Sequence, residues 1–285
     1  MAELAAELDR RDLADEAPHR QRAPQLRLWS GLWPQLAALA VALSVWQVVV
    51  WSGWRPSSVL PGPLPVFHSL LGDLSNGGFY FGVAITLQRA VLGYGIAVLV
   101  GSAVGLLVAR VSILRRALGS ALLGLQSMPS ISWFPLAILL FQRSEPAIIF
   151  VVLLGAAPAI ANGLLSGVDH VQPLLVRVGR VMGARGLGLY RHIILPAALP
   201  GFVGGLKQGW AFAWRSLMAG ELIIAFTGHE PSLGQQLRLA QNLSDTRQLV
   251  ALMIVIFTIG VAVDLGFGVL DGEIRRRWGL LGAES

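Results

Sequence analysis

The stretch AVLGYGIAVLVGSAVGLLVA, residues 90–109, contains no ionisable side chain other than Tyr94. A helix needs about 20 apolar residues to cross the hydrocarbon core of a bilayer, which is roughly 30 Å thick. The stretch meets both conditions of length and composition, so it predicts a transmembrane helix.

The composition of the whole chain is typical of a membrane protein. Of its 285 residues, 54% are hydrophobic and 13% are charged, whereas soluble domains carry about 25% charged residues. The chain has no cysteine, which excludes disulfides, thiolate zinc sites, iron–sulfur clusters and cysteine catalysis. The net charge of +6 comes from arginines in small groups between apolar runs. That distribution indicates membrane loops and argues against a nucleic-acid-binding face, which needs clustered cations.

Further apolar segments of spanning length occur on both sides of the first one, at residues 32–51, 116–143, 147–167, 201–226 and 249–270. The segment between Arg116 and Arg143 contains Pro129 and Pro135, so it is predicted to be kinked or broken. The sequence therefore predicts an all-α, polytopic membrane protein with about six transmembrane helices.

The arginines also predict the orientation of the chain. Basic segments alternate with weakly charged ones along the sequence, and cytoplasmic loops carry the excess of Lys and Arg. Both termini are therefore expected in the cytoplasm (N-in/C-in), with a short amphipathic helix before Pro18. The expected layout is a cytoplasmic tail (1–30), a first transmembrane helix with an external loop (31–79), a transmembrane domain (80–272) with a cytoplasmic loop at 168–198, and a cytoplasmic tail (273–285).

Small residues recur every fourth position in two of the predicted spans, at Gly93, Ala97, Gly101 and Gly105 and again at Gly201, Gly205, Gly209 and Ala213. Such rows let two helix backbones approach closely. They predict internal helix packing, with a dimer seam or a wall of the translocation path as the alternative.

Three charged residues in the predicted spans are candidate intramembrane polar residues: Arg215, Glu221 and Asp264. Charges inside a membrane are costly and usually face the interior of the helix bundle. Arg215 and Glu221 are six residues apart and lie on largely different faces of a helix. Ion pairing with other helices is the first expectation, and contact with substrate is the second.

The chain lacks the motifs of the common catalytic sites. Lys207 is the only lysine and stands between Leu206 and Gln208, so no Gly-Lys-Ser/Thr phosphate loop is present. The sequence also contains no G-x-S-x-G elbow and no H-E-x-x-H pair. We therefore expect no catalytic residue, no metal site and no cofactor in this chain.

The connection RVGRVMGARGLGLYRHIILPAALP, residues 177–200, is long, basic and rich in glycine. Loops of this length in compact proteins are usually functional. Its apolar residues predict one or two short helices at the membrane face, with a helical stop at Pro196. The contact that they offer is either to a partner or to lipid headgroups.

Within this connection, Gly183 is followed after nine residues by Ile193-x-Leu195-Pro196. This pattern resembles the G-x9-I-x-L-P "EAA" loop of ABC importer permeases, with its spacing kept. The resemblance implies a coupling helix that docks into a cleft of a cytoplasmic ATPase subunit. The residues that it assigns to coupling are Gly179, Met182, Gly183, Ala184, Gly186, Tyr190, Ile193, Leu195 and Pro196. The E-A-A triplet falls at Arg177-Val178-Gly179, so the glutamate is absent here.

Other segments between residues 80 and 278 resemble the same family: Thr86-Leu87-x-Arg89, Trp214, Glu221-Leu222-Ile223, Leu233-Gly234, Gly260 with Asp264, and the basic end Arg275–Trp278. The nearest branch is that of the nitrate, sulfonate and taurine permeases. The resemblance implies a type I ABC importer permease fold in a bacterial inner membrane. It also implies a homodimer, separate ATPase subunits that bind ATP and Mg, and an extracytoplasmic solute-binding protein.

The expected function is therefore a translocation path for a small anionic solute, with aliphatic sulfonate or taurine first. Nitrate, bicarbonate or a pyrimidine vitamin precursor are the alternative solutes. A self-sufficient secondary transporter or channel is the alternative class, although no internal inverted repeat supports it. A membrane-embedded enzyme lacks the catalytic residues that it would need.

Overall fold

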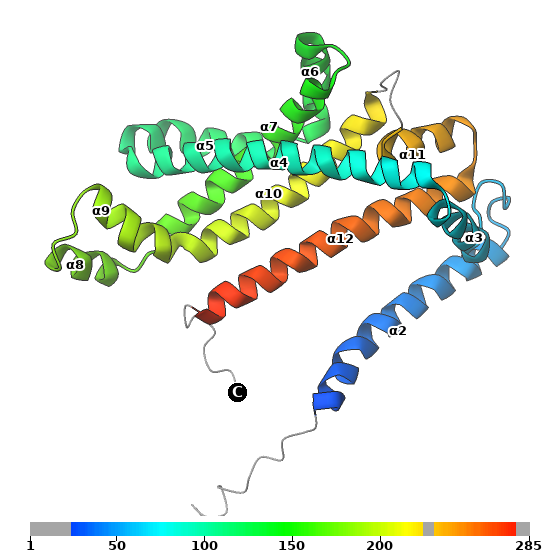
Figure 1. Ribbon diagram of the computed structural model, residues 1–285, viewed down its shortest axis with the longest axis horizontal. Helices are drawn as coiled ribbons and strands as arrows, with labels where there is room; N and C mark the ends of the chain where they lie inside the picture. Colours follow the sequence, from blue (N-terminus) through cyan, green and yellow to red (C-terminus); the bar gives the residue numbers. More distant parts are fainter. Residues whose placement is uncertain (1–23, 225–230, 278–285) are drawn as a thin grey trace, which may run out of the picture. The chain divides into compact units, whose positions relative to one another are not determined.

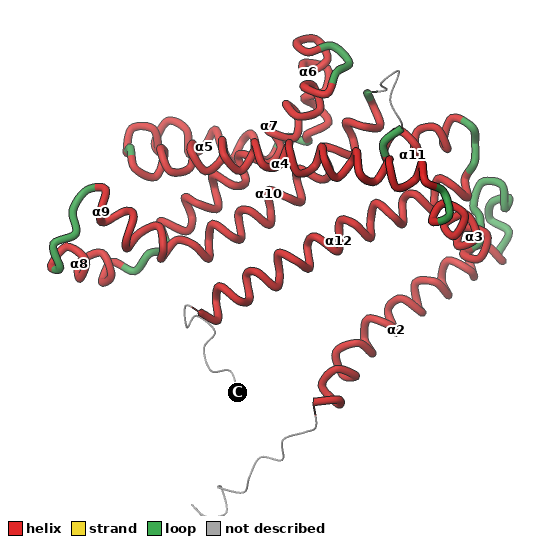
Figure 2. The backbone as a smooth tube through the Cα atoms, viewed as in Figure 1, coloured by secondary structure: helices red, strands yellow, loops and turns green. Residues whose placement is uncertain are grey.

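The computed structural model describes residues 24–224 and 231–277, and every regular element in these ranges is a helix (Figure 1, Figure 2). The longest helices are α2 (Pro24–Trp51), α4 (Gly77–Arg110), α7 (Glu145–Asp169), α10 (Leu195–Ile223) and α12 (Thr246–Arg277). The shorter ones are α3 (Pro63–Leu74), α5 (Ser112–Ser127), α6 (Phe134–Phe141), α8 (Pro173–Val181), α9 (Leu187–Leu189) and α11 (Leu233–Asn242), with a 3-10 turn η1 (Ser130–Trp133) and a π-helical turn η2 (Tyr190–Ile194). The all-α prediction is confirmed, while the short helix expected before Pro18 lies outside the described residues.

The chain divides into two compact units, residues 1–63 and 64–285. In the first, Trp46 near the end of α2 donates its indole N–H to the Pro61 carbonyl at 3.1 Å. This bond ties the loop after α2 back onto the helix. The second unit contains the elements from α3 to α12 described below.

Four helices in the described ranges, α2, α4, α7 and α12, are long and apolar enough to cross a membrane. A fifth span is obtained if α5 and the segment formed by η1 and α6 count as one broken crossing. α10 covers the remaining predicted span with 29 residues, but Lys207, Arg215 and Glu221 make it more polar than the others. All six expected spans thus correspond to helices in the structure. Four of them are long and apolar enough to cross a membrane, or five if the bent pair is one span.

The break in the third predicted span occurs at its prolines. The two halves, Ser112–Ser127 and Ser130–Phe141, meet at an angle of 102°. Met128, the residue before Pro129, is extended at φ −72° and ψ 132°, as steric contact with a following proline favours. Pro135 lies in the first turn of α6, where its missing N–H costs nothing. The predicted break is confirmed.

The core of the second unit is α7, which packs against both α4 and α10 along the rows of small residues. A Cβ at Gly105 of α4 would lie 2.9 Å from the Ala161 carbonyl oxygen of α7, and one at Gly205 of α10 would lie 2.7 Å from the Gly163 Cα. Real Cβ atoms do not come this close to a backbone, so glycine is required where the helices touch. The rows therefore serve internal packing, and α7 contributes small residues of its own to both contacts.

Candidate functional site

The basic loop (residues 168–198) joins α7 to α10 and exposes apolar side chains. Its first helix, α8, turns Gly179 inward, where it is buried against Leu189 and Ile193. The opposite side is open, with Val181 88% and Met182 81% exposed. This combination of a packed face and an exposed apolar face is typical of a surface that binds a partner protein or a membrane.

The turn after α8 depends on glycine for its backbone conformation. Gly183 has φ +89° and Gly186 has φ +53°, and neither has a heavy atom within 4 Å of where a Cβ would stand. Side chains have room at both positions, but L-residues rarely adopt these angles. The turn is closed by the Ala184 N–H, which donates to the Gly179 carbonyl at 3.0 Å.

The predicted helical stop at Pro196 is wrong. The chain remains helical from α9 through η2 into α10, with Pro196 in the first turn of α10. Pro196 has no N–H to donate to the preceding turn. The residue before it, Leu195, donates its N–H five residues back to the Tyr190 carbonyl, and this π-helical turn allows the helix to continue through Pro196. π-Helical turns of this kind are frequent at functional sites. The basic loop is thereby joined to the membrane core by continuous helix.

At the other end of α10 lies a carboxylate network, formed by Glu221 with Thr86, Arg89, Glu145 and Gly234. The Glu221 side chain is fully buried. One of its oxygens accepts hydrogen bonds from the Thr86 hydroxyl at 2.9 Å and from the Gly234 N–H at 3.1 Å. The other accepts one from the Arg89 guanidinium at 3.1 Å. Buried carboxylates need this number of partners, because an unpaired buried charge is very costly.

Arg89 connects the network to α7. Its Nη2 lies 2.8 Å from the Glu145 carboxylate at the start of that helix. The Glu145 side chain is 55% exposed, whereas that of Arg89 is 8% exposed. The network therefore runs from the interior to the surface and ties α4, α7, α10 and α11 together.

The three candidate polar residues have different surroundings. Glu221 pairs with Arg89 of another helix, as expected, and Asp264 of α12 pairs with Lys207 of α10 at 3.2 Å. Arg215 is exposed and makes no ion pair within residues 24–224 and 231–277. For Arg215, the described residues supply no ion-pair partner, so contact with substrate stays open as the alternative prediction.

Sequence reasoning did not find that Thr86, Arg89, Glu221 and Gly234 form one site. In the sequence, these residues fall in separate segments that resemble the same family. The Arg89–Glu221 pair spans 132 residues, and no local pattern encodes such a contact. The only signal in the sequence was an arginine directly before the span at 90–109 and a glutamate inside the span at 201–226, with two other predicted spans between them.

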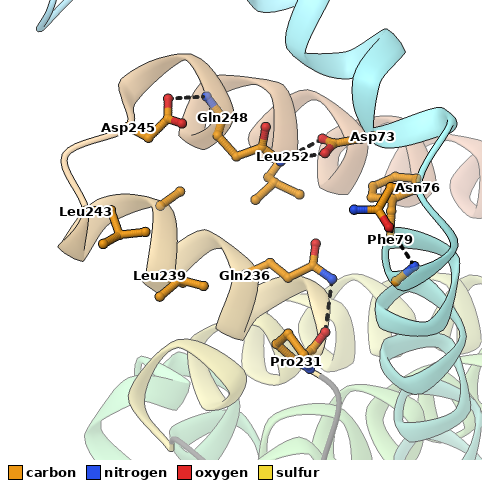
Figure 3. Close-up of a pocket in the computed structure, with 12 residues that line it drawn as sticks. Asp73, Asn76, Phe79, Pro231, Gln236, Leu239, Leu243, Asp245, Gln248 and Leu252 are labelled. Carbon is orange, nitrogen blue, oxygen red and sulfur yellow. Dashed lines mark hydrogen bonds between the residues drawn. The ribbon is translucent and has the colours of Figure 1, made fainter.

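A cavity of about 500 Å³ is lined by α3, α4, α11 and α12, and so shares α4 and α11 with the carboxylate network (Figure 3). Both carboxylate oxygens of Asp73 accept hydrogen bonds from the Gln248 amide, at 2.7 and 2.8 Å. Burial raises the pKa of the Asp73 carboxyl, and the Gln248 hydrogen bonds oppose that shift while the Asp245 charge adds to it. In the described part of the chain, no three His, Asp or Glu side chains are grouped to hold a metal ion.

The helical spans, the helical loop with its exposed apolar face and the long helix that joins it to a buried ionic network define a membrane transport subunit. Residues 67–276 match the family described as "Binding-protein-dependent transport system inner membrane component". The chain belongs to this family of ABC transporter permeases, which are multi-pass inner-membrane proteins.

Three similar proteins illustrate the family. The taurine transport system permease protein TauC of Escherichia coli (strain K12) is 30% identical over 244 residues, covering 84% of this chain and 87% of TauC. The nitrate import permease protein NrtB of Synechocystis sp. is 29% identical over 270 residues, covering 90% of this chain and 94% of NrtB. A permease chain in "Inward facing conformations of the MetNI methionine ABC transporter" has a TM-score of 0.60 at 19% identity, covering 69% of this chain and 96% of that chain. The last similarity confirms the predicted type I permease fold.

Proposed function

We propose that this permease forms the translocation path of an ATP-driven bacterial importer for a small sulfonate such as taurine. Similarity to TauC supports this solute, and the comparable similarity to NrtB makes nitrate the second candidate. The permease would work as a homodimer with two ATPase subunits that bind ATP and Mg, and an extracytoplasmic binding protein would deliver the solute. Both termini and the basic loop would lie in the cytoplasm. Arginine-rich segments alternate with weakly charged ones between the predicted spans, and the positive-inside rule places the arginine-rich segments in the cytoplasm.

The observation that carries the coupling role is the exposed apolar face of the basic loop. Val181 and Met182 are among its most exposed side chains, and arginines surround them at residues 177, 180, 185 and 191. Fully exposed apolar side chains within a basic rim fit a docking cleft on a partner protein. The absent glutamate of the EAA pattern implies that the contact here is mainly apolar.

The helical path from this loop into α10 provides the mechanical link. ATP binding would bring the two ATPase subunits together and displace the docked loops. Since η2 and α10 form continuous helix, a displacement of the loop would be passed to the membrane core as a rigid-body movement. Alternating access would then be an equilibrium between two conformations of the permease. ATP and the loaded binding protein would each shift this equilibrium by binding one conformation more tightly than the other.

The test compares two glycines of the same loop. Gly183→Asp places a side chain on a backbone with φ +89°, whereas Gly188 has ordinary angles and open space around it. We expect Gly183→Asp to insert into the membrane but to lose at least tenfold in uptake and in co-purification of the ATPase. Gly188→Asp adds the same charge and should retain both. Normal uptake by Gly183→Asp would contradict the coupling role.

The solute is tested by growth of a strain that lacks this gene. Such a strain should fail on taurine or alkanesulfonates as the sole sulfur source and should grow on sulfate. Equal growth on all sulfur sources would contradict the sulfonate proposal, and failure on nitrate as the nitrogen source would favour the second candidate. Solute uptake by this chain alone in liposomes, driven by an ion gradient, would instead indicate a secondary transporter.

A further inference from the structure

Arg215 is a charged side chain deep within α10. It lies eight residues before the end of the helix at Ile223, which corresponds to about 12 Å along the axis. The other charges of α10 have partners: Lys207 pairs with Asp264, and Glu221 pairs with Arg89. Over the described ranges of the chain, Arg215 has only a ring contact, with its Cζ 5.9 Å from the centre of Phe212.

Arg215 lines a cavity of about 520 Å³ between α10, α11 and α12. The walls are aromatic and aliphatic, with Trp214, Met218 and Phe257 among them, and Asp264 also lines the cavity. Because Asp264 is paired with Lys207, the cavity keeps the positive charge of Arg215. Trp210 also lines it, and the buried indole N–H of Trp210 has no acceptor among the residues described.

A charged group at this depth requires either water or an ionic partner, because lipid solvates it poorly. Guanidinium groups bind planar and tetrahedral oxyanions through two parallel hydrogen bonds. An indole N–H can only donate, so it too requires an acceptor. The cavity therefore offers the guanidinium donors and the positive charge of Arg215, set in apolar walls that strengthen electrostatic attraction.

We propose that Arg215 binds the oxyanion group of the transported solute as the solute passes between α10 and α12. The inference rests on the proposed function for its solute class, a small anion with a sulfonate or nitrate group. It makes Arg215 the specificity-determining residue of the permease itself, in addition to the selection made by the binding protein. The phosphate of a lipid headgroup has the same chemistry, so the experiment distinguishes a soluble anion from lipid.

The test uses the absence of native cysteine. Ala211 lines the same cavity one helical turn before Arg215, so Ala211→Cys introduces a single thiol beside the guanidinium. Membrane vesicles containing the full chain are treated with anionic 2-sulfonatoethyl methanethiosulfonate, which carries an ethanesulfonate group, or with its cationic trimethylammonium analogue. We expect the ratio of anionic to cationic labelling rates to fall about tenfold when Arg215→Gln is added, the effect of one nearby charge in a partly screened site. Ethanesulfonate in solution should slow the anionic reaction only when Arg215 is present.

Leu99→Cys on α4 is the matched control, because Leu99 is 73% exposed but lies outside the cavity and should react with neither reagent. Met218→Cys repeats the measurement if Ala211→Cys does not reach the membrane. A thiol at both cavity positions that reacts with neither reagent would overturn the proposal, as would a rate ratio that Arg215→Gln leaves unchanged. Labelling that ethanesulfonate does not slow would assign Arg215 to lipid phosphate and also overturn it. Labelling does not depend on coupling or uptake, so a failure of sulfonate import would contradict the proposed function separately.

Discussion

The side chains at the two ends of α10 differ in whether they find their partners within this chain. At the Glu221 end, a fully buried carboxylate has partners for both oxygens, drawn from α4 and α11. At the basic-loop end, Val181 and Met182 are exposed, and none of the four loop arginines makes an ion pair within the described residues. One end is complete within this chain, whereas the other is completed by a partner in our proposal.

This difference assigns the two ends different mechanical roles. Buried ion pairs resist rearrangement, because separating them leaves an uncompensated charge. In the turn of the basic loop, no heavy atom lies within 4 Å of where a Cβ of Gly183 or Gly186 would stand. We infer that the Glu221 end anchors α11 and the start of α7 to α10, and that motion enters at the basic loop.

Removal of the Glu221 carboxylate should give the largest effect. Glu221→Leu leaves the Thr86 hydroxyl and the Gly234 N–H without the acceptor described above and removes the buried carboxylate that pairs with Arg89. Breaking a buried pair in this way costs about 3–5 kcal/mol. The measurement is the free energy of unfolding of the purified permease in detergent micelles.

Glu145→Gln is the control for that prediction, because it removes a second carboxylate partner of the same arginine at a position that is 55% exposed. Exposed ion pairs contribute about 0–1 kcal/mol, so this variant should stay close to the wild type. An equal loss of unfolding free energy in both variants would show that burial of Glu221 does not strengthen its ion pair. The contrast between the two ends of α10 would then be wrong.

The sequence predicted the parts of the fold that follow from composition and local pattern. The apolar segments, the break at Pro129 and the close packing of the glycine rows all depend on residues near each other in the chain. The partners of Glu221 and Asp264 were not predictable in the same way, because pairing depends on which helices become neighbours. The helical continuation through Pro196 was missed because proline usually ends a helix, and only tertiary structure shows the π-helical turn that accommodates it.

The middle of α10 must be rigid if motion at one end is to reach the other. Gly205 touches the α7 backbone, whereas no heavy atom lies within 4 Å of a Cβ at Gly204. Gly205→Val should therefore force α7 and α10 apart and destabilise the protein by about 1–3 kcal/mol. Gly204→Ala should be neutral or stabilising by up to about 1 kcal/mol, since alanine favours helix. Thermal unfolding of both variants tests this, and similar midpoints would exclude a tight contact between the two helices.

The smallest expected effect is at Asp73, near the Glu221 end of α10. Its carboxylate accepts hydrogen bonds from the Gln248 amide, where Glu221 pairs with a cation. Burial raises its pKa in the folded protein above the ordinary value of about 3.9. A raised pKa means that the folded state favours the protonated carboxyl. The resulting stability is fully present below the ordinary pKa and is lost as the pH rises through the folded-state pKa.

Asp73→Asn keeps an acceptor for Gln248 and removes the charge that burial and Asp245 disfavour. Its unfolding midpoint should match the wild type at low pH and should exceed it slightly at pH 7, because only the wild type then holds a partly buried charge at residue 73. Unfolding midpoints measured between about pH 4 and pH 8 test this, with Asp245→Asn as the companion variant that removes only the repulsion. A lower midpoint for Asp73→Asn at pH 7 would mean that its two hydrogen bonds with Gln248 outweigh the cost of burial. Asp73 would then be a satisfied anchor of the same kind as Glu221, although no cation pairs with it in the residues described.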